Sequence, residues 1–288
     1  MNFEVHMVNG IEGCESCLIL SGSDAVLIDT GYSIGADKTA ENIAKHLDGR
    51  ELLHIILTHS HYDHVMGTPN ICDLFPNAKI YAHQNVKKTF SKPKVRKALE
   101  ELNCAAAKER CVIPEKPRTD ELHVDFEIKD GDIINIGEMK IRVIETPGHT
   151  KDSISLYFEN ENLVFASESH GVALDFPAVV PGFVSSYDDT VASINKIKKI
   201  DPDYIIMPHS KMISGYETDI YLDNALLEAG KIKNIVLTSY DEGCDVEEIT
   251  EKLKPIYHTG GFGKYQPYDA LHANWIPMIK KLIEQFRQ

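Results

Sequence analysis

The sequence lacks any apolar run that approaches the roughly 20 residues of a membrane-spanning helix. Its first residues, Met1–His6, also lack the basic start and apolar stretch of a secretory signal peptide. The 288 residues are 43% hydrophobic, which is enough to bury a full core in one domain. We therefore expect a cytoplasmic protein with no membrane partner.

Positive charge is also scarce in this chain. Its 30 lysines and arginines face 44 aspartates and glutamates, and the formal net charge is −14 at pH 7. An acidic surface repels the phosphate backbone of DNA or RNA. We therefore expect no nucleic-acid partner.

Cysteine is sparse and scattered. A chain of this size does not need disulfides to be stable, so we expect reduced thiols. The Cys14-x-x-Cys17 spacing is a weak redox or metal signal, because no second pair accompanies it and Cys17 opens the strand-like Leu18–Leu20. We interpret this pair as structural. The six cysteines are Cys14, Cys17, Cys72, Cys104, Cys111 and Cys244.

One short segment, by contrast, is dense in potential metal ligands. Four of them, three histidines and one aspartate, occupy residues 59–64 directly behind an apolar run at residues 52–58 that predicts a buried strand. A solvated loop has no structural need for imidazoles and a carboxylate so close together, whereas a metal ion needs such donors to converge. The four side chains are His59, His61, Asp63 and His64.

Three later apolar runs end in the same way. They deliver His149 after Thr146-Pro147-Gly148, Glu168 after Ser167, and His209 after Pro208. Loops at strand ends are where a rigid sheet commonly holds functional groups. We therefore expect these side chains to share one edge of the fold.

The ordered set resembles the signature of the metallo-β-lactamase superfamily, and of its glyoxalase II, thioesterase and lactonase-like branch. That signature is His-x-His-x-Asp-His, a later histidine, a bridging carboxylate and a last histidine. Supporting matches are Val26–Gly31 before the motif and Pro208-His209-Ser210 at its end. The resemblance implies an α/β fold, the αββα four-layer sandwich of this superfamily, with a helical C-terminal extension.

The resemblance also implies two divalent metal ions, with zinc expected and iron or manganese as alternatives. His59, His61 and His149 would hold one ion, and Asp63, His64 and His209 the other. Glu168 would bridge them, although the family usually has Gly-Asp where this chain has Ser167-Glu168. The longer glutamate leaves open whether it bridges or only forms a salt bridge beside a single metal.

In the chemistry that the family implies, the ions supply a hydroxide at neutral pH and polarise the attacked carbonyl or phosphoryl group. Asp63 and Glu168 are the predicted catalytic carboxylates, with Asp63 orienting the hydroxide. Asp29 would accept a ring N–H from a ligand histidine. Turn formation with Thr30-Gly31 is a compatible role for Asp29.

The reaction class that we expect is hydrolysis of an ester, thioester or lactone of a small, anionic substrate. Diiron oxygen-reducing relatives carry glutamate where this chain has His61, and no Gly-rich dinucleotide fingerprint is present. A phosphodiesterase of the same fold is one alternative. An iron-dependent oxidase or persulfide dioxygenase is another.

The predicted catalytic domain spans residues 1–215, with a basic helical insertion at 84–121. Ten cations and four anions lie between Lys87 and Arg118, so this stretch carries +6 in an acidic chain. One hypothesis is a lid that attracts an anionic substrate, and the alternative is an ordinary solvated helical face. Residues 216–288 form the predicted helical extension, which would wall the substrate pocket.

Four further residues are candidates for contacting substrate. They are His170, Tyr187, Tyr216 and His272. His170 lies two residues after Glu168 and would point the same way along an extended chain. The sequence leaves open whether the chain is a monomer or a homodimer.

Overall fold

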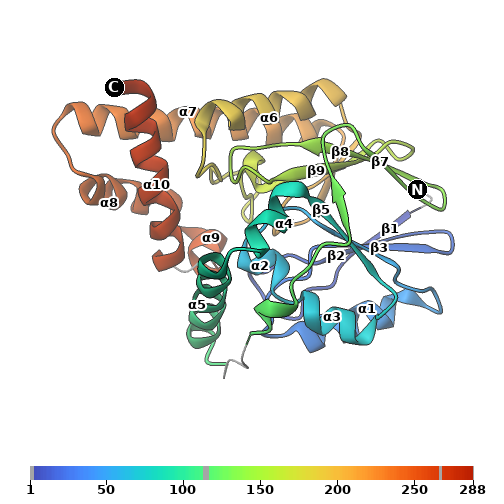
Figure 1. Ribbon diagram of the computed structural model, residues 1–288. Coiled ribbons are helices and arrows are strands. Elements are labelled where there is room, and N and C mark those ends of the chain that lie inside the picture. The colour runs from blue at the N-terminus through green and yellow to red at the C-terminus, as the bar shows by residue number, and fades with distance from the viewer. Residues whose placement is uncertain (1–2, 113–116, 266–267, 288) are drawn as a thin grey trace. The chain divides into compact units, whose positions relative to one another are not determined.

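The computed structural model describes residues 3–112, 117–265 and 268–287. It contains two six-stranded sheets with helices, which confirms the expected sandwich with a helical extension (Figure 1). The strand orders are β1-β2-β3-β4-β5-β6 and β12-β11-β10-β9-β8-β7. No helix of the described residues is both long and apolar enough to cross a bilayer.

The strands are mostly short. They are β1 (Phe3–Met7), β2 (Cys17–Ser21), β3 (Asp24–Ile28), β4 (His54–Leu57), β5 (Lys79–His83), β6 (Phe126–Ile128), β7 (Ile133–Ile136), β8 (Met139–Glu145), β9 (Ile154–Phe158), β10 (Leu163–Phe165), β11 (Tyr204–Ile206) and β12 (Met212–Ser214). The α-helices are α1 (Ala36–Leu47), α2 (Tyr62–Val65), α3 (Thr68–Leu74), α4 (Gln84–Phe90), α5 (Pro93–Glu109), α6 (Tyr187–Ile200), α7 (Tyr216–Asp241), α8 (Val246–Tyr257), α9 (Gly260–Tyr265) and α10 (Tyr268–Arg287). Two 3-10 turns, η1 (Thr119–Glu121) and η2 (Glu168–His170), complete the set.

The chain divides into two compact units, and the first comprises residues 1–145 and 154–162. In this unit β1, β2 and β3 are antiparallel, and β3 to β6 continue the sheet in parallel. Strand β4 is buried through Ile55, Ile56 and Leu57, as its unbroken apolar run predicts. Helices α1 and α3 pack side by side (Figure 1). The His59–His64 segment therefore begins directly after a buried strand, which holds its first residues in place.

The second unit comprises residues 146–153 and 163–288. Strands β10 and β11 are parallel neighbours in it, and β12 is antiparallel to β11. Helices α7, α8 and α10 enclose an apolar cluster that includes Ile232, Leu253 and Trp275. The predicted limits of the catalytic domain and of the extension stay a prediction.

The helix boundaries show where pattern reading succeeded and where it failed. The sequence pattern predicts one helix from Asp37 and another from about Pro93. Helix α1 starts one residue before Asp37, and α5 starts at Pro93. The glycine-rich sequence of residues 258–265 predicts a loop, and this prediction is wrong, because α9 occupies most of the segment. Its first turn is stabilised from elsewhere in the chain, since the Asp175 carboxylate accepts a hydrogen bond from the Gly261 N–H at 2.6 Å.

Candidate metal centre

The first unit presents its ligand candidates on the turn that follows β4. His59 is 1% exposed and packs against two other imidazoles, with its ring centroid 4.7 Å from that of His61 and 4.1 Å from that of His64. Asp63 and His64 lie in the short helix α2, which His61 precedes as its cap. One strand end therefore gathers three imidazoles and a carboxylate.

Asp29 organises this turn. Its carboxylate accepts hydrogen bonds from the backbone N–H of Thr58 at 2.7 Å, from the Thr58 hydroxyl at 2.6 Å, and from Nδ1 of His64 at 2.7 Å. Because a carboxylate only accepts, Nδ1 of His64 carries the proton and Nε2 is the nitrogen with a lone pair. This is the role predicted for Asp29. Its backbone φ of 59° lies in the left-handed region.

Thr58 extends the control of Asp29 to a second histidine. Its hydroxyl proton points to Asp29, so its oxygen is left to accept from Nδ1 of His59 at 3.2 Å. That hydrogen bond leaves Nε2 of His59 as the nitrogen with a lone pair. The sequence analysis missed Thr58, and its position directly before His59 was the available signal.

The second unit presents Glu168 between two histidines. Oε2 of Glu168 lies 3.5 Å from Nε2 of His149, and Oε1 lies 3.2 Å from Nε2 of His209. Glu168 follows β10 and His209 follows β11, so the parallel pairing of these strands brings both residues to the same end. His209 has a φ of 56°, a conformation that non-glycine residues adopt mainly where the surroundings enforce it.

His149 is also held in one tautomer. Its Nδ1 donates to the carbonyl oxygen of Gly182, and a carbonyl oxygen can only accept. Nε2 of His149, the nitrogen that faces Glu168, therefore has the lone pair. The backbone N–H of His149 is held by the hydroxyl of Ser169 at 2.9 Å. The sequence analysis did not predict a role for Gly182 or Ser169. The only signals in the sequence were that Gly182 follows Pro181 and that Ser169 follows Glu168.

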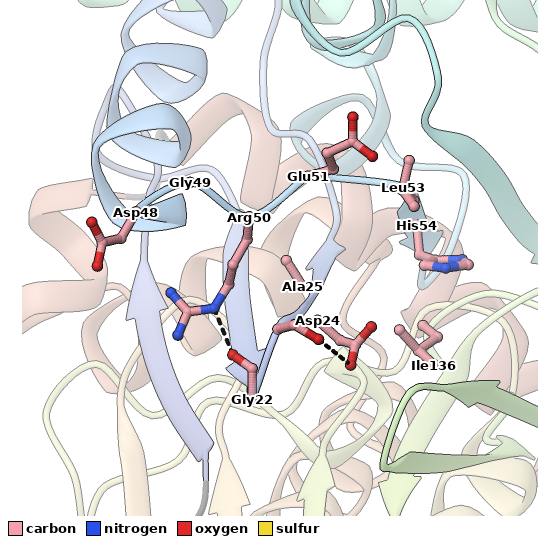
Figure 2. A pocket seen from close by; sticks show the side chains of 11 residues that line it. Gly22, Asp24, Ala25, Asp48, Gly49, Arg50, Glu51, Leu53, His54 and Ile136 are labelled. Carbon is pink, nitrogen blue, oxygen red and sulfur yellow. Dashed lines mark hydrogen bonds between the residues drawn. The ribbon is translucent and has the colours of Figure 1, made fainter.

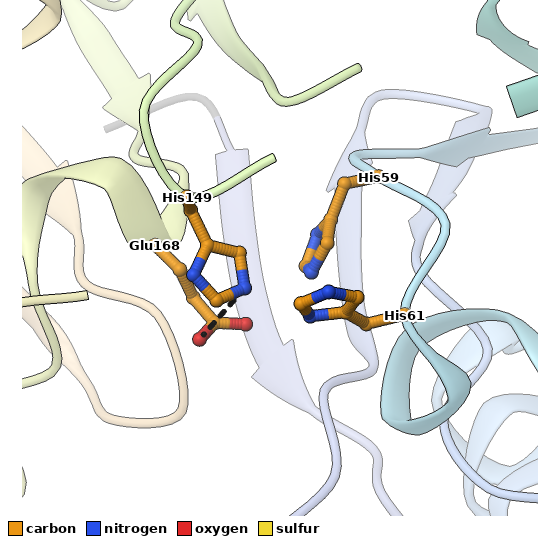
Figure 3. A group of neighbouring side chains, drawn as sticks. All are labelled: His59, His61, His149 and Glu168. Carbon is orange, nitrogen blue, oxygen red and sulfur yellow. Dashed lines mark ion pairs between the residues drawn. The ribbon is translucent and has the colours of Figure 1, made fainter. Parts of the chain in front are cut away.

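Two groups of side chains in the described residues could each hold a metal ion, because their ligand atoms all lie within 4.8 Å of one another. Figure 3 shows the side chains of the first group and the ion pair between His149 and Glu168. The division is the one that the resemblance implies. The groups are His59, His61, His149 and Glu168, and Asp63, His64, Glu168 and His209.

These donors fit divalent metal ions. Imidazole nitrogen and carboxylate oxygen are the ligands that zinc, iron and manganese take in proteins. Three of the imidazoles, those of His59, His64 and His149, are held with the proton on Nδ1. Such outer hydrogen bonds are the usual support of histidines that bind metal.

The four candidates for substrate contact lie in different settings. His170 is fully buried in η2, so the extended chain expected for it is wrong, and burial lowers its pKa to about 4. The ring of Tyr187 forms T-shaped pairs with the rings of Phe183 and Phe286 in the helical core. Their substrate roles, and those of the two residues described next, stay predictions.

Tyr216 and His272 lie at the surface of helices. Tyr216 is 77% exposed at the start of α7. His272 of α10 pairs with Glu247 at 2.8 Å.

The basic insertion is anchored to the first unit. Ala106 and Ala107 of α5 pack in a cluster with Tyr32 and Tyr62. Several of its cations have partners, among them Arg96 with Asp120, Lys87 with Glu127 and Arg118 with Asp73. Lys92, Lys94 and Lys108 are exposed and, in the described part of the chain, unpaired. Glu115 and Lys116 lie outside the described residues.

A hollow of about 530 Å³ opens on the first unit (Figure 2). The turn at residues 22–25 and the connection at residues 48–54 line it. Arg50 donates there to the carbonyl of Gly22 at 2.8 Å. None of the predicted ligands is among its described lining residues.

Cys14 and Cys17 are free, buried thiols. Burial raises the pKa of Cys14 to about 12 and raises that of Cys17 well above its usual range. A high pKa keeps both thiols protonated and weakly nucleophilic. Their packing agrees with the structural interpretation.

Comparisons with known proteins agree with this arrangement. The chain is 30% identical over 189 residues to a hydroxyacylglutathione hydrolase of Francisella tularensis subsp. novicida (strain U112), which covers 65% of this chain and 58% of that protein. It is 27% identical over 201 residues to a hydroxyacylglutathione hydrolase of Rhodopseudomonas palustris (strain BisB5), covering 68% and 65%. The chain thus spans less than two thirds of the length of these curated relatives.

Solved structures show the same fold over nearly the whole chain. The metallo-beta-lactamase family protein TTHA1429 from Thermus thermophilus superposes with a TM-score of 0.69 at 16% identity, covering 99% of this chain and 93% of that one. The archaeal superfamily protein ST1585 from Sulfolobus tokodaii superposes with a TM-score of 0.64 at 18% identity, covering 98% of each chain. The family model of the metallo-beta-lactamase superfamily matches residues 10–209. This chain therefore belongs to the metallo-beta-lactamase superfamily.

Proposed function

We propose that this protein is a dinuclear metal-dependent hydrolase that cleaves a thioester, ester or lactone of a small substrate. The observation that carries the dinuclear assignment is the position of Glu168. Its two carboxylate oxygens face different histidines, Oε2 toward His149 and Oε1 toward His209. A carboxylate in this position can offer one oxygen to each of two ions, so the glutamate suits a bridge despite its extra methylene.

The proposed chemistry divides between the metal ions and the side chains. When bound, the ions lower the pKa of a water molecule toward neutrality and polarise the carbonyl of the substrate. Asp63, which is largely buried, orients the attacking hydroxide by accepting its hydrogen bond. In thioester hydrolysis the new C–O bond forms as the C–S bond breaks, and the products are an acid and a thiol.

A thioester is the preferred substrate class because of the relatives. Hydroxyacylglutathione, the compound in their names, is an acyl thioester of an anionic peptide. Lys92, Lys94 and Lys108 leave unpaired positive charge on α5 and the residue before it, which suits an anionic substrate. We therefore propose a small anionic thioester, and we propose zinc as the metal.

The test uses protein loaded with zinc, manganese or iron. It is assayed against an S-acyl glutathione, a lactone and bis(4-nitrophenyl) phosphate, and its metal content is measured by elemental analysis. We expect two metal equivalents per chain and cleavage of the thioester that EDTA abolishes and added metal restores. Cleavage of the phosphodiester alone would assign the chain to that alternative. Binding of a single metal ion per chain would show that Glu168 does not bridge two ions.

A further inference from the structure

His149 and Glu168 lie on two separate buried turns of the second unit, and one hydroxyl joins those turns. Ser169 follows Glu168 and is 1% exposed. Its hydroxyl accepts from the His149 backbone N–H at 2.9 Å and donates to the Thr146 carbonyl at 2.6 Å. A single side chain therefore connects the backbone beside Glu168 to both ends of the Thr146–His149 turn.

Gly182 makes a second connection between the same turns. Its carbonyl oxygen accepts the Nδ1 hydrogen of His149. A Cβ atom at this position would lie 2.1 Å from the carbonyl oxygen of Glu168 and 3.1 Å from its carbonyl carbon. Both neighbours are backbone atoms and cannot rotate away. Only glycine therefore lets this backbone touch His149 and Glu168 together.

The segment after Gly182 follows the His149 turn closely. The carbonyl oxygen of Gly148 accepts from the backbone N–H groups of Val184 at 3.0 Å and Ser185 at 2.9 Å. It also accepts from the Ser185 hydroxyl at 2.9 Å. The hydrogen bonds of Val184 and Ser185 thus hold the carbonyl of Gly182 in place independently of its contact with the His149 imidazole.

We infer that Ser169 and Gly182 form a clamp that sets the position of His149 relative to Glu168 and so pre-organises the metal ligands. Both are positioning residues, since they act through these two side chains. Fixing ligands before a metal arrives lowers the conformational entropy lost on binding. The inference rests on the proposed metal centre and is independent of the substrate.

The test compares two clamp variants with two matched controls. Ser169→Ala removes the hydroxyl between the turns, and Gly182→Ala forces the backbone contact apart. The control Ser193→Ala removes a hydroxyl that is also 1% exposed and donates to the Pro147 carbonyl at 2.7 Å, without bonding to His149 or Glu168. The control Gly230→Ala adds a Cβ atom that meets nothing within 4 Å.

Three measurements separate positioning from simple stability. They are zinc affinity by chelator competition, the visible absorption spectrum of the cobalt-loaded protein, and Tm of the metal-free protein. We expect both clamp variants to lose about tenfold or more in metal affinity, with a changed cobalt spectrum. Both controls should keep the affinity and spectrum of the unmodified protein, although Ser193→Ala should lower Tm much as Ser169→Ala does.

Equal zinc affinity and equal cobalt spectra in Ser169→Ala and Ser193→Ala would overturn the clamp. If Gly182→Ala does not fold, the comparison of Ser169→Ala with Ser193→Ala tests the clamp. Ser169→Cys, which keeps a weak hydrogen-bond donor and acceptor, should then have an intermediate metal affinity. An unmodified protein that binds metal but cleaves no thioester leaves the clamp intact and refutes the proposed substrate. An unmodified protein that binds no metal overturns the metal centre itself.

Discussion

Oδ2 of Asp29 accepts a hydrogen bond from Nδ1 of His64 at 2.7 Å, and both side chains are buried. The same oxygen receives the Thr58 hydroxyl, whose own oxygen accepts from Nδ1 of His59. One carboxylate thus fixes the tautomers of two predicted ligands, the first directly and the second through Thr58.

The first prediction tests this relay with Thr58→Val, which removes the hydroxyl at nearly constant volume. Asp29 then loses a donor and His59 loses its acceptor, so we expect metal affinity to fall by about tenfold. We also expect the free energy of unfolding to fall by about 1–3 kcal/mol, because buried polar groups lose their partners. Metal titration and urea denaturation measure these changes.

Thr58→Ser is the matched control, since it keeps the hydroxyl and removes a methyl group. It should retain most of the metal affinity. If Thr58→Val binds metal as tightly as Thr58→Ser, the relay plays no part in holding the ligands.

The second prediction concerns the length and charge of Glu168. Glu168→Gln keeps the length but replaces one ligating oxygen with an amide nitrogen, so we expect one metal equivalent to be lost. Glu168→Asp keeps both oxygens but is one methylene shorter, and it should bind two metals with a changed metal–metal distance. Elemental analysis and X-ray absorption spectroscopy measure these outcomes.

The exposed Glu138 supplies the control for that pair, because Glu138→Gln makes the same chemical change at a residue that is in neither ligand group. Its metal content should equal that of the unmodified protein. Two tightly held metals in Glu168→Gln would show that this residue is not a bridge.

The third prediction addresses the positive charge on the insertion. Replacing Lys92, Lys94 and Lys108 with alanine should raise KM for an anionic thioester and leave kcat nearly unchanged, because these lysines attract substrate without touching the reacting atoms. The effect should shrink as salt is added. Lys38→Ala on α1, where Lys38 pairs with Glu41, is the control. An unchanged KM in the triple variant would refute the attraction.

The fourth prediction follows from His170, whose pKa burial lowers from 6.5 to about 4. The unfolded chain binds a proton at this residue below about pH 6.5, whereas the folded protein resists protonation until about pH 4. Stability from the neutral imidazole is therefore complete above pH 6.5 and is lost as pH falls through this window. The loss is on the order of 3 kcal/mol.

Denaturation of the unmodified protein and of His170→Gln at pH 7, 6, 5 and 4 measures that loss. As pH falls, the free energy of unfolding of the unmodified protein should decrease more than that of His170→Gln. Parallel pH profiles would show that His170 does not titrate in this window.

Much of the site was readable from the order of residues along the chain. The seven side chains named from the motif are the seven that the two groups contain. Such reading works because each candidate follows an apolar run directly, and a buried strand leaves its next residues at the sheet edge. The departure at Glu168 was also visible in the sequence. The direction in which the Glu168 carboxylate points was not visible in the sequence, because it depends on the conformation of the turn η2 that carries this residue.

Helix α9 and the residues that hold the ligands escaped sequence reading for a physical reason. The first turn of α9 is capped by Asp175, more than eighty residues earlier in the chain, so no local pattern predicts it. Gly182 reaches His149 through a backbone carbonyl, which every residue possesses and no sequence pattern distinguishes. The amino-acid sequence by itself determined the family and the fold class and predicted the ligand set, because periodicity and motif spacing are local properties. Only the tertiary structure decided which hydrogen bonds fix each imidazole and which oxygen of Glu168 faces which histidine, because those relations join segments far apart in the chain.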